Sequence, residues 1–307
     1  MISDQIYKIF HEKNSVQRRF ARATFEVWQK FGFHVVGDHF YDPIPNTQTI
    51  KQAYRSDIRS LPALVADWPK LADTACTVIE AHLDDYLENR TAVGYVEDNN
   101  FFTGLDALYY YSFIKERKPN RIIEIGQGVS TRIAIAALAQ NINGEQIPEL
   151  ITIDPYSRLS INTPPDIRYT VLQKPLQEIQ ADISVMLGSG DLLFVDSSHV
   201  FKFASDVQLL FEQVYPNLAD GVFIHIHDIF TPFNYPIDWM TKKNRFWNEQ
   251  YFLESFLFFN TRFTIETPIH YIARTSKIED LLSRKNVSSS VVRREGSSIY
   301  LIKHEPK

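Results

Sequence analysis

The sequence predicts an α/β fold with a doubly wound, mostly parallel sheet of seven strands and a helical extension before it. Two observations predict this fold class. From about residue 100, short runs rich in apolar and β-branched residues alternate with stretches of helical periodicity, which is typical of strands joined by crossover helices. The first five runs are mostly apolar along their length, as expected for strands buried on both faces.

The elements of this α/β part follow in order along the chain. Strands are expected at Arg121–Ile125, Leu150–Ile153, Arg168–Leu172, Asp191–Val195, Gly221–His227, near Phe263–Glu266 and at Ser298–Lys303. Helices are expected at Thr131–Gln140, Leu176–Leu187, Lys202–Tyr215 and around Phe246–Phe259. The polar stretch Thr275–Gly296 is predicted to be a loop or excursion.

The first third of the chain has helical periodicity. Apolar residues at helical spacing predict a helix over Phe20–Phe31, which Gly32 can close, and a second long helix over Lys70–Asn89. We therefore predict two parts: a helical extension, residues 1–95, and an α/β domain, residues 96–307. The extension is expected to serve as a lid over the site or as a contact in a homodimer.

Composition narrows the class of protein. The chain has 307 residues, of which 44% are hydrophobic and 22% charged, values that fit a folded protein and not a disordered one. Its net charge of −5 argues against a nucleic-acid partner. The sequence has no apolar run of about 18 residues and no signal-peptide core at its start, so no membrane association is expected. A single cysteine, Cys76, excludes an internal disulfide and favours a cytoplasmic location.

A glycine-containing turn follows the first predicted strand. Glu124 is followed by Gly126 and Gly128, and then by Ser130 and Thr131 at the start of a helix. Two glycines allow the backbone to turn sharply and to approach a ligand closely. Thr131 stands where a dinucleotide fingerprint has its third glycine, which weakens an NAD interpretation. Taken alone, this turn could be an ordinary strand-to-helix connection.

Acidic residues and histidines follow three further strands, at the edge where open parallel sheets bind ligands. Asp154 follows the second strand and could accept hydrogen bonds from both hydroxyls of a ribose, or could cap a loop. Asp196 and His199 follow the fourth strand, and His227 and Asp228 follow the fifth. These two strands should be neighbours about 5 Å apart, so their four side chains are expected to converge.

Structural roles are the alternative for single members of this group. His199 could hydrogen-bond backbone at a helix start, and Asp228 could cap the next turn. His225 shares a strand face with His227, because side chains alternate with a period of two. We expect His225 to be a hydrogen-bonded histidine of the core.

Together these residues resemble the class I S-adenosylmethionine-dependent methyltransferases, which have a Rossmann-like fold. The resemblance covers about residues 100–307. It rests on the turn Glu124-x-Gly126-x-Gly128, on Asp154, on Asp196-Ser-Ser-His199 and on His227-Asp228. Related families include small-molecule O-methyltransferases that place Mg²⁺ on carboxylates at the last two of these strand ends. Ser198 stands where related sequences often carry a second acidic residue.

The resemblance implies a role for each residue of the cofactor site. Gly126 and Gly128 would pack against the methionine part of S-adenosyl-L-methionine, and Asp154 would hold its ribose. Glu124 would orient the turn or the amino group of the cofactor. Ser130 and Thr131 would contribute hydroxyls, and Asp196 would line the same site.

The reaction itself requires an acceptor that has lost its proton, placed in line with the methyl carbon. His199 is the first candidate for the base that accepts this proton, and His227 is the second. Alternatively, Asp196, His227 and Asp228 hold a divalent ion that lowers the pKa of the acceptor oxygen. Mg²⁺ prefers oxygen ligands, so the nitrogen of His227 would favour a transition metal.

The expected acceptor is a small molecule, such as a sugar or a secondary metabolite. Three segments could form its walls: residues 39–45, 230–236 and 245–251. A scaffold or regulatory subunit that binds the cofactor without turnover, and an NAD-dependent oxidoreductase, are the competing hypotheses.

Overall fold

The computed structural model describes residues 16–17, 19–38, 41–142 and 147–305 of the chain. Internal contacts divide the chain into two compact units, Met1–Ser56 with Tyr235–Phe246, and Asp57–Asn234 with Trp247–Lys307. Among the described residues, no helix is both long enough and apolar enough to cross a bilayer.

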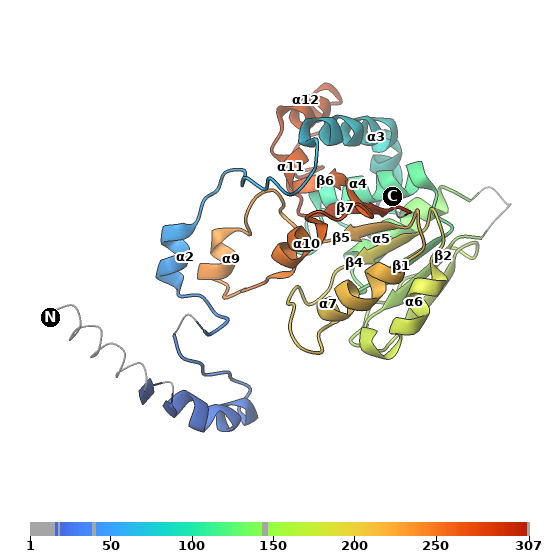
Figure 1. Ribbon diagram of the computed structural model, residues 1–307. Coiled ribbons are helices and arrows are strands. Elements are labelled where there is room, and N and C mark those ends of the chain that lie inside the picture. Colours follow the sequence, from blue (N-terminus) through green and yellow to red (C-terminus); the bar gives the residue numbers. More distant parts are fainter. Residues whose placement is uncertain (1–15, 18, 39–40, 143–146, 306–307) are drawn as a thin grey trace. The chain divides into compact units, whose positions relative to one another are not determined.

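The second unit is built on one seven-stranded sheet, as the sequence predicts (Figure 1). Its strands are β1 (Arg121–Ile125), β2 (Glu149–Ile153), β3 (Arg168–Leu172), β4 (Leu192–Val195), β5 (Phe223–Ile226), β6 (Phe263–Pro268) and β7 (Ile299–Lys303). Their order is β3-β2-β1-β4-β5-β7-β6, and β1 to β5 pair in parallel. β7 runs antiparallel to both of its neighbours, β5 and β6. The mostly parallel, doubly wound fold is thereby confirmed.

This strand order fixes where a ligand can bind. The chain leaves β1 toward β2 on one side and returns to β4 on the other side, so the connections diverge between β1 and β4. In open α/β sheets, ligands bind at such a switch point, beyond the carboxyl ends of the strands. Residues that follow β1, β2, β4 and β5 therefore lie along one edge of the sheet, where such a ligand would bind.

Helices cover both faces of the sheet (Figure 1). One face packs against α3 (Trp68–Asn89), α4 (Gly104–Arg117), α5 (Val129–Ala139), α11 (Ile269–Ala273) and α12 (Ser276–Arg284). The other packs against η1 (Leu176–Glu178), α6 (Gln180–Met186), α7 (Asp206–Leu209), the π-helical turn η2 (Leu210–Val214), α8 (Tyr215–Asn217) and α10 (Glu249–Leu257). Alternating strand residues supply the two cores: Ile122 and Phe194 face the first set, and Ile123 and Val195 face the second.

The first unit consists of short helices. Residues 19–30 are helical, and Gly32 follows with a φ of +79°, which confirms the predicted helix and its end. Residues 33–38 and 41–46 form neither helix nor strand. The chain then forms α2 (Thr47–Ala53), which Asn46 caps by accepting a hydrogen bond from the Gln48 N–H, and which packs on α9 (Ile237–Thr241).

Three expectations about individual elements were wrong. Helix α4 was missed because most of its length is buried on all sides, so its sequence lacks an amphipathic stripe. The stretch expected to be a loop contains α12, whose Ile278, Leu281 and Leu282 are buried on one face. Strand β3 is mostly exposed rather than buried, because it lies at the edge of the sheet.

Two other helices begin a few residues later than the sequence predicts. The helix expected from Lys202 begins at Asp206, because Ser205 is its N-cap and accepts a hydrogen bond from the Gln208 N–H at 3.0 Å. The aromatic helix is α10, which begins three residues later than expected, at Glu249.

Candidate active site

The turn between β1 and α5 requires glycine at one position and leaves room at another. Gly126 has a φ of +93°, and a Cβ built there would lie 2.7 Å from the carbonyl oxygen of Asp196. Any other residue would be strained and would clash with the backbone. A Cβ at Gly128 meets nothing within 4 Å. The backbone of Gly128 is therefore open to close approach by a ligand.

Asp154 is tied to this turn. Its Oδ2 accepts a hydrogen bond from the Gln127 N–H at 3.1 Å, and its Oδ1 accepts one from the Tyr156 N–H at 2.7 Å. The Gln127 side chain, which sequence reasoning did not single out, binds Tyr169 and the backbone of Leu159. A carboxylate has about four acceptor positions, so Asp154 keeps capacity for the hydroxyls of a ligand. A turn open at Gly128 with a carboxylate beside it fits an adenosyl cofactor.

Glu124 and its neighbours lie beneath the turn. Glu124 is fully buried: its Oε1 accepts a hydrogen bond from the Tyr110 hydroxyl at 3.2 Å, and its Oε2 has no hydrogen-bond partner among the described residues. Burial raises the pKa of Glu124 to about 7. The nearby hydroxyls of Thr131, Tyr110 and Ser130 lower this pKa, but burial has the larger effect. Thr131 Oγ1 accepts a hydrogen bond from the Gly128 N–H at 3.1 Å, so its hydroxyl holds the turn itself.

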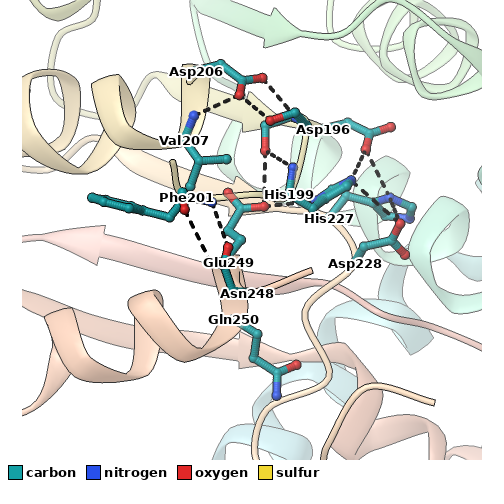
Figure 2. A network of polar contacts seen from close by, with 12 residues as sticks. Asp196, His199, Phe201, Asp206, Val207, His227, Asp228, Asn248, Glu249 and Gln250 are labelled. Carbon is teal, nitrogen blue, oxygen red and sulfur yellow. Dashed lines mark hydrogen bonds and ion pairs between the residues drawn. The ribbon is translucent and has the colours of Figure 1, made fainter. Parts of the chain in front are cut away.

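The ends of β4 and β5 bring four predicted side chains together (Figure 2). His199 Nε2 lies 3.2 Å from Asp196 Oδ1 and 3.7 Å from Asp228 Oδ2. His227 Nδ1 lies 3.6 Å from Asp196 Oδ1 and 3.8 Å from Asp228 Oδ2. The expected convergence of the two strand ends is thus observed.

Two further carboxylates, which the sequence did not single out, complete this group. Glu249 at the start of α10 accepts a hydrogen bond from His199 Nδ1 at 2.9 Å. Asp106 in the first turn of α4 has its Oδ2 3.7 Å from His227 Nε2. Four carboxylates thus surround two imidazoles, so the formal charge is −2 even when both histidines are protonated. Such an excess of negative charge favours a cation at this place.

The carboxylates determine how the histidines ionise. Burial alone would lower the pKa of His199, but hydrogen bonds and charges from Asp196 and Glu249 outweigh it and raise that pKa to about 10. The pKa of His227 is likewise raised well above its ordinary value, because the charges of Asp228, Asp106 and Asp196 outweigh its burial. Desolvation raises the pKa of Asp196, yet the close contacts with the two histidines and their charges hold it well below its usual range.

Three of these residues form a group that could hold a metal ion. One ligand atom each from Asp196, His227 and Asp228 lies within 4.8 Å of the others. His227 Nδ1 is buried and makes no hydrogen bond to the described residues. Two carboxylates and an unpartnered imidazole nitrogen fit a divalent ion, and the nitrogen suits a transition metal better than Mg²⁺.

Two members of the group have left-handed backbone conformations. The φ angle is +58° at His199 and +57° at Asp228. Each such conformation in a residue other than glycine costs about 1 kcal/mol or more, and such residues concentrate at functional sites. Both residues direct their side chains into the shared cluster.

His225 belongs to the core, as expected, but without the expected hydrogen bonds. It is fully buried, with its ring stacked on Tyr300 at 4.0 Å and edge-on to Phe194 at 4.6 Å. Neither ring nitrogen has a hydrogen-bond partner among the described residues. Burial holds the pKa of His225 well below its ordinary value, so the ring is neutral.

The three segments predicted to form walls for the acceptor differ in their locations and contacts. Residues 41–45 lie in the first unit, and residues 39 and 40 lie outside the described chain. Phe230 and Phe233 are buried against His270 and contribute to packing. Of residues 247–251, Trp247 lies over the His199 ring at 4.2 Å and Glu249 binds it. That segment therefore contributes to the cluster itself.

Sequence comparisons match part of this chain to other proteins. Residues 123–229 match the family model of a methyltransferase domain. An uncharacterized protein of Archaeoglobus fulgidus is 32% identical over 127 residues, which cover 38% of this chain and 57% of that protein. The chain thus spans little more than half the length of this curated relative.

Solved structures of methyltransferases are also similar, at low sequence identity. The S-adenosylhomocysteine-bound methyltransferase PaMTH1 of Podospora anserina is 13% identical, with a TM-score of 0.39 over 85% of this chain and 94% of its own. The O-methyltransferase TomG of Streptomyces achromogenes, from tomaymycin synthesis and bound to S-adenosylmethionine, is 12% identical, with a TM-score of 0.40 over 79% and 92%.

Proposed function

We propose that this chain, which carries a class I S-adenosylmethionine-dependent methyltransferase domain, transfers a methyl group to an oxygen of a small-molecule acceptor. The acceptor we favour is a sugar or a secondary metabolite. One observation supports the proposal: a glycine turn that is open to a ligand and a cluster of ionisable side chains lie at adjacent strand ends. Gly126 lies against the backbone of Asp196, so the two halves adjoin directly.

The cofactor half would bind and orient S-adenosylmethionine. Gly128 offers its open backbone to the methionine part, and Asp154 accepts hydrogen bonds from the ribose hydroxyls. Glu124 supports the turn from below through its buried carboxyl group. When bound, the cofactor supplies an electrophilic methyl group, so the protein needs to place the acceptor and take its proton.

The reaction half would remove the proton from the acceptor. His199 is our candidate base, and with three carboxylates around it its pKa is near 10. A cation shared by Asp196 and Asp228 would offset part of this negative charge. The pKa of His199 would then fall toward neutrality, where an imidazole accepts a proton readily.

A divalent ion would be held by Asp196, His227 and Asp228. When bound, such an ion supplies Lewis acidity that lowers the pKa of a hydroxyl near it. Asp106 faces the other ring nitrogen of His227 at 3.7 Å and would fix the orientation of this ligand.

Calorimetric titration with S-adenosylmethionine and then with S-adenosylhomocysteine tests the cofactor part of the proposal. Transfer of a radiolabelled methyl group to a panel of sugars, glycosides and catechols tests the reaction. We expect both compounds to bind and at least one acceptor to be labelled. Absence of binding by either compound would refute the proposal, and binding without transfer would favour a cofactor-binding scaffold. Binding of NAD in their place would favour an oxidoreductase.

A further inference from the structure

Glu249 is a buried carboxylate whose contacts all point to His199 and its loop. Its side chain is fully buried at the first position of α10. Its Oε2 accepts hydrogen bonds from His199 Nδ1 at 2.9 Å and from Ser197 Oγ at 3.1 Å. Its Oε1 has no hydrogen-bond partner among the described residues. A carboxylate kept only for structure would be expected to have both oxygens satisfied.

The start of α10 also holds the backbone of the same loop. The N–H groups of Asn248 and Glu249 both donate to the His199 carbonyl oxygen, at 3.1 and 3.2 Å. Asn248 Oδ1 accepts a hydrogen bond from the Phe201 N–H at 2.6 Å. The backbone of His199, which is left-handed, is therefore fixed by the same helix end that binds its ring (Figure 2).

The ring plane of His199 is fixed as well. The Trp247 ring lies 4.2 Å from the His199 ring at an interplanar angle of 34°. With one nitrogen bound to Glu249 and one face covered, the other nitrogen has a single direction available. Nε2 accordingly faces Asp196 and Asp228, at 3.2 and 3.7 Å.

We propose that Glu249 is the positioning residue of the reaction: through His199 Nδ1 it fixes the ring so that Nε2 is the nitrogen presented to the acceptor, beside Asp196 and Asp228. This inference rests on the proposed function, because it deepens the role of His199. The carboxylate accepts the hydrogen bond of Nδ1–H, so this nitrogen is held away from the acceptor and the ring cannot turn over. A base oriented by a third group is a recurring arrangement in enzymes.

The isosteric variant Glu249→Gln separates this role from packing. The Gln side chain has the shape of Glu but no charge, so it holds Nδ1–H more weakly and leaves the ring less well fixed. We expect its kcat to fall about 10²-fold, with the Kd for S-adenosylmethionine and the KM for the acceptor within about twofold of wild type. Glu249→Asp keeps a carboxylate and should recover part of the lost kcat. His199→Gln combined with Glu249→Gln should be no slower than His199→Gln alone.

Nuclear magnetic resonance of ¹⁵N-histidine-labelled protein tests the pair without turnover. The Nδ1–H bound to a carboxylate should give a low-field proton resonance, present in wild type and absent in His199→Gln and Glu249→Gln. Glu254→Gln is the matched control, because Glu254 is buried on the same helix but binds Arg59 and Thr231. Its folded form should keep the resonance and the wild-type kcat.

The outcomes distinguish failure of this inference from failure of the proposed function. Absence of the resonance in wild type, its persistence in Glu249→Gln, or a wild-type kcat in that variant would overturn the inference. A wild-type protein that shows the resonance but methylates no acceptor would instead count against the proposed function.

Discussion

The two halves of the candidate site are built in different ways. The cofactor half, at the ends of β1 and β2, uses backbone: one glycine with a positive φ, one glycine open to a ligand, and Asp154 bound to two N–H groups. The reaction half, at the ends of β4 and β5, uses side chains, most of which are buried. The carboxylates of α10 and α4 that reach its two histidines lie 50 residues from His199 and 121 residues from His227 along the sequence.

This difference predicts how each half responds to mutation. A backbone site should depend on conformational freedom and on a few exposed hydrogen bonds. A site of coupled, mostly buried charges should lose far more when one member is removed, since each member contacts several of the others. The following experiments test that contrast.

The largest effect is expected for Asp228→Asn in the reaction half. The variant removes a carboxylate that faces both histidines and that accepts a hydrogen bond from Ser297 Oγ at 3.0 Å. Methyl transfer should fall about 10³-fold, or about 4 kcal/mol in the barrier, and Mn²⁺ affinity measured by calorimetry should fall with it. Asp238→Asn, at an exposed carboxylate that pairs with Lys242, is the control.

Removal of metal is the companion experiment. Turnover should drop in the presence of a chelator and should return when Mn²⁺ or Mg²⁺ is added in excess. Turnover that resists the chelator would leave the histidine base as the remaining mechanism and would remove the metal from the proposal.

In the cofactor half, alanine substitutions at the two glycines should have opposite effects on stability and on cofactor binding. Gly126→Ala introduces a Cβ at a φ of +93° and 2.7 Å from a carbonyl oxygen, so we expect a loss of about 2–3 kcal/mol in stability. Gly128→Ala meets no protein atom within 4 Å and should melt like wild type, yet should weaken cofactor binding. Thermal melting and calorimetry measure the two effects, and equal melting temperatures for both variants would contradict this account.

Asp154→Ala should have a moderate effect restricted to the cofactor. Loss of its charge-assisted hydrogen bonds should weaken S-adenosylmethionine binding by about 1–3 kcal/mol, or roughly 5- to 150-fold in Kd. Mn²⁺ affinity should stay unchanged, because Asp154 belongs to the other half. An unaltered Kd for the cofactor would remove Asp154 from the site.

The smallest effect on activity is expected where the change concerns the pH dependence of stability. Glu124 has a folded-state pKa of about 7 against an ordinary 4.5, so between these values the folded protein binds more protons than the unfolded chain. Its contribution therefore lowers stability as pH rises from about 4.5 to 7, by roughly 3 kcal/mol. Glu124→Gln should be more stable than wild type at pH 8, with the difference vanishing near pH 4. Parallel denaturation curves for the two proteins over this range would show that Glu124 is not buried in this way.

Much of the α/β domain could be predicted because its signals are local. β1 and β3 occupy the residues expected, and Gly126, Asp154, Asp196 and Asp228 follow their strands as the alternation of elements implies. Elements whose burial depends on distant partners could not be predicted. α4 is enclosed on all sides, and the position of β3 at the sheet edge follows only from the strand order.

The candidate site divides along the same line. The sequence by itself determined the glycine turn, the carboxylate after β2 and the two histidine–aspartate pairs, because a strand end places its own residues at that edge of the sheet whatever packs around it. Only the tertiary structure decided that Asp106 and Glu249 reach the histidines. Their helices are brought to the site by hydrophobic packing on opposite faces of the sheet, and no local pattern records which buried carboxylate such packing will deliver.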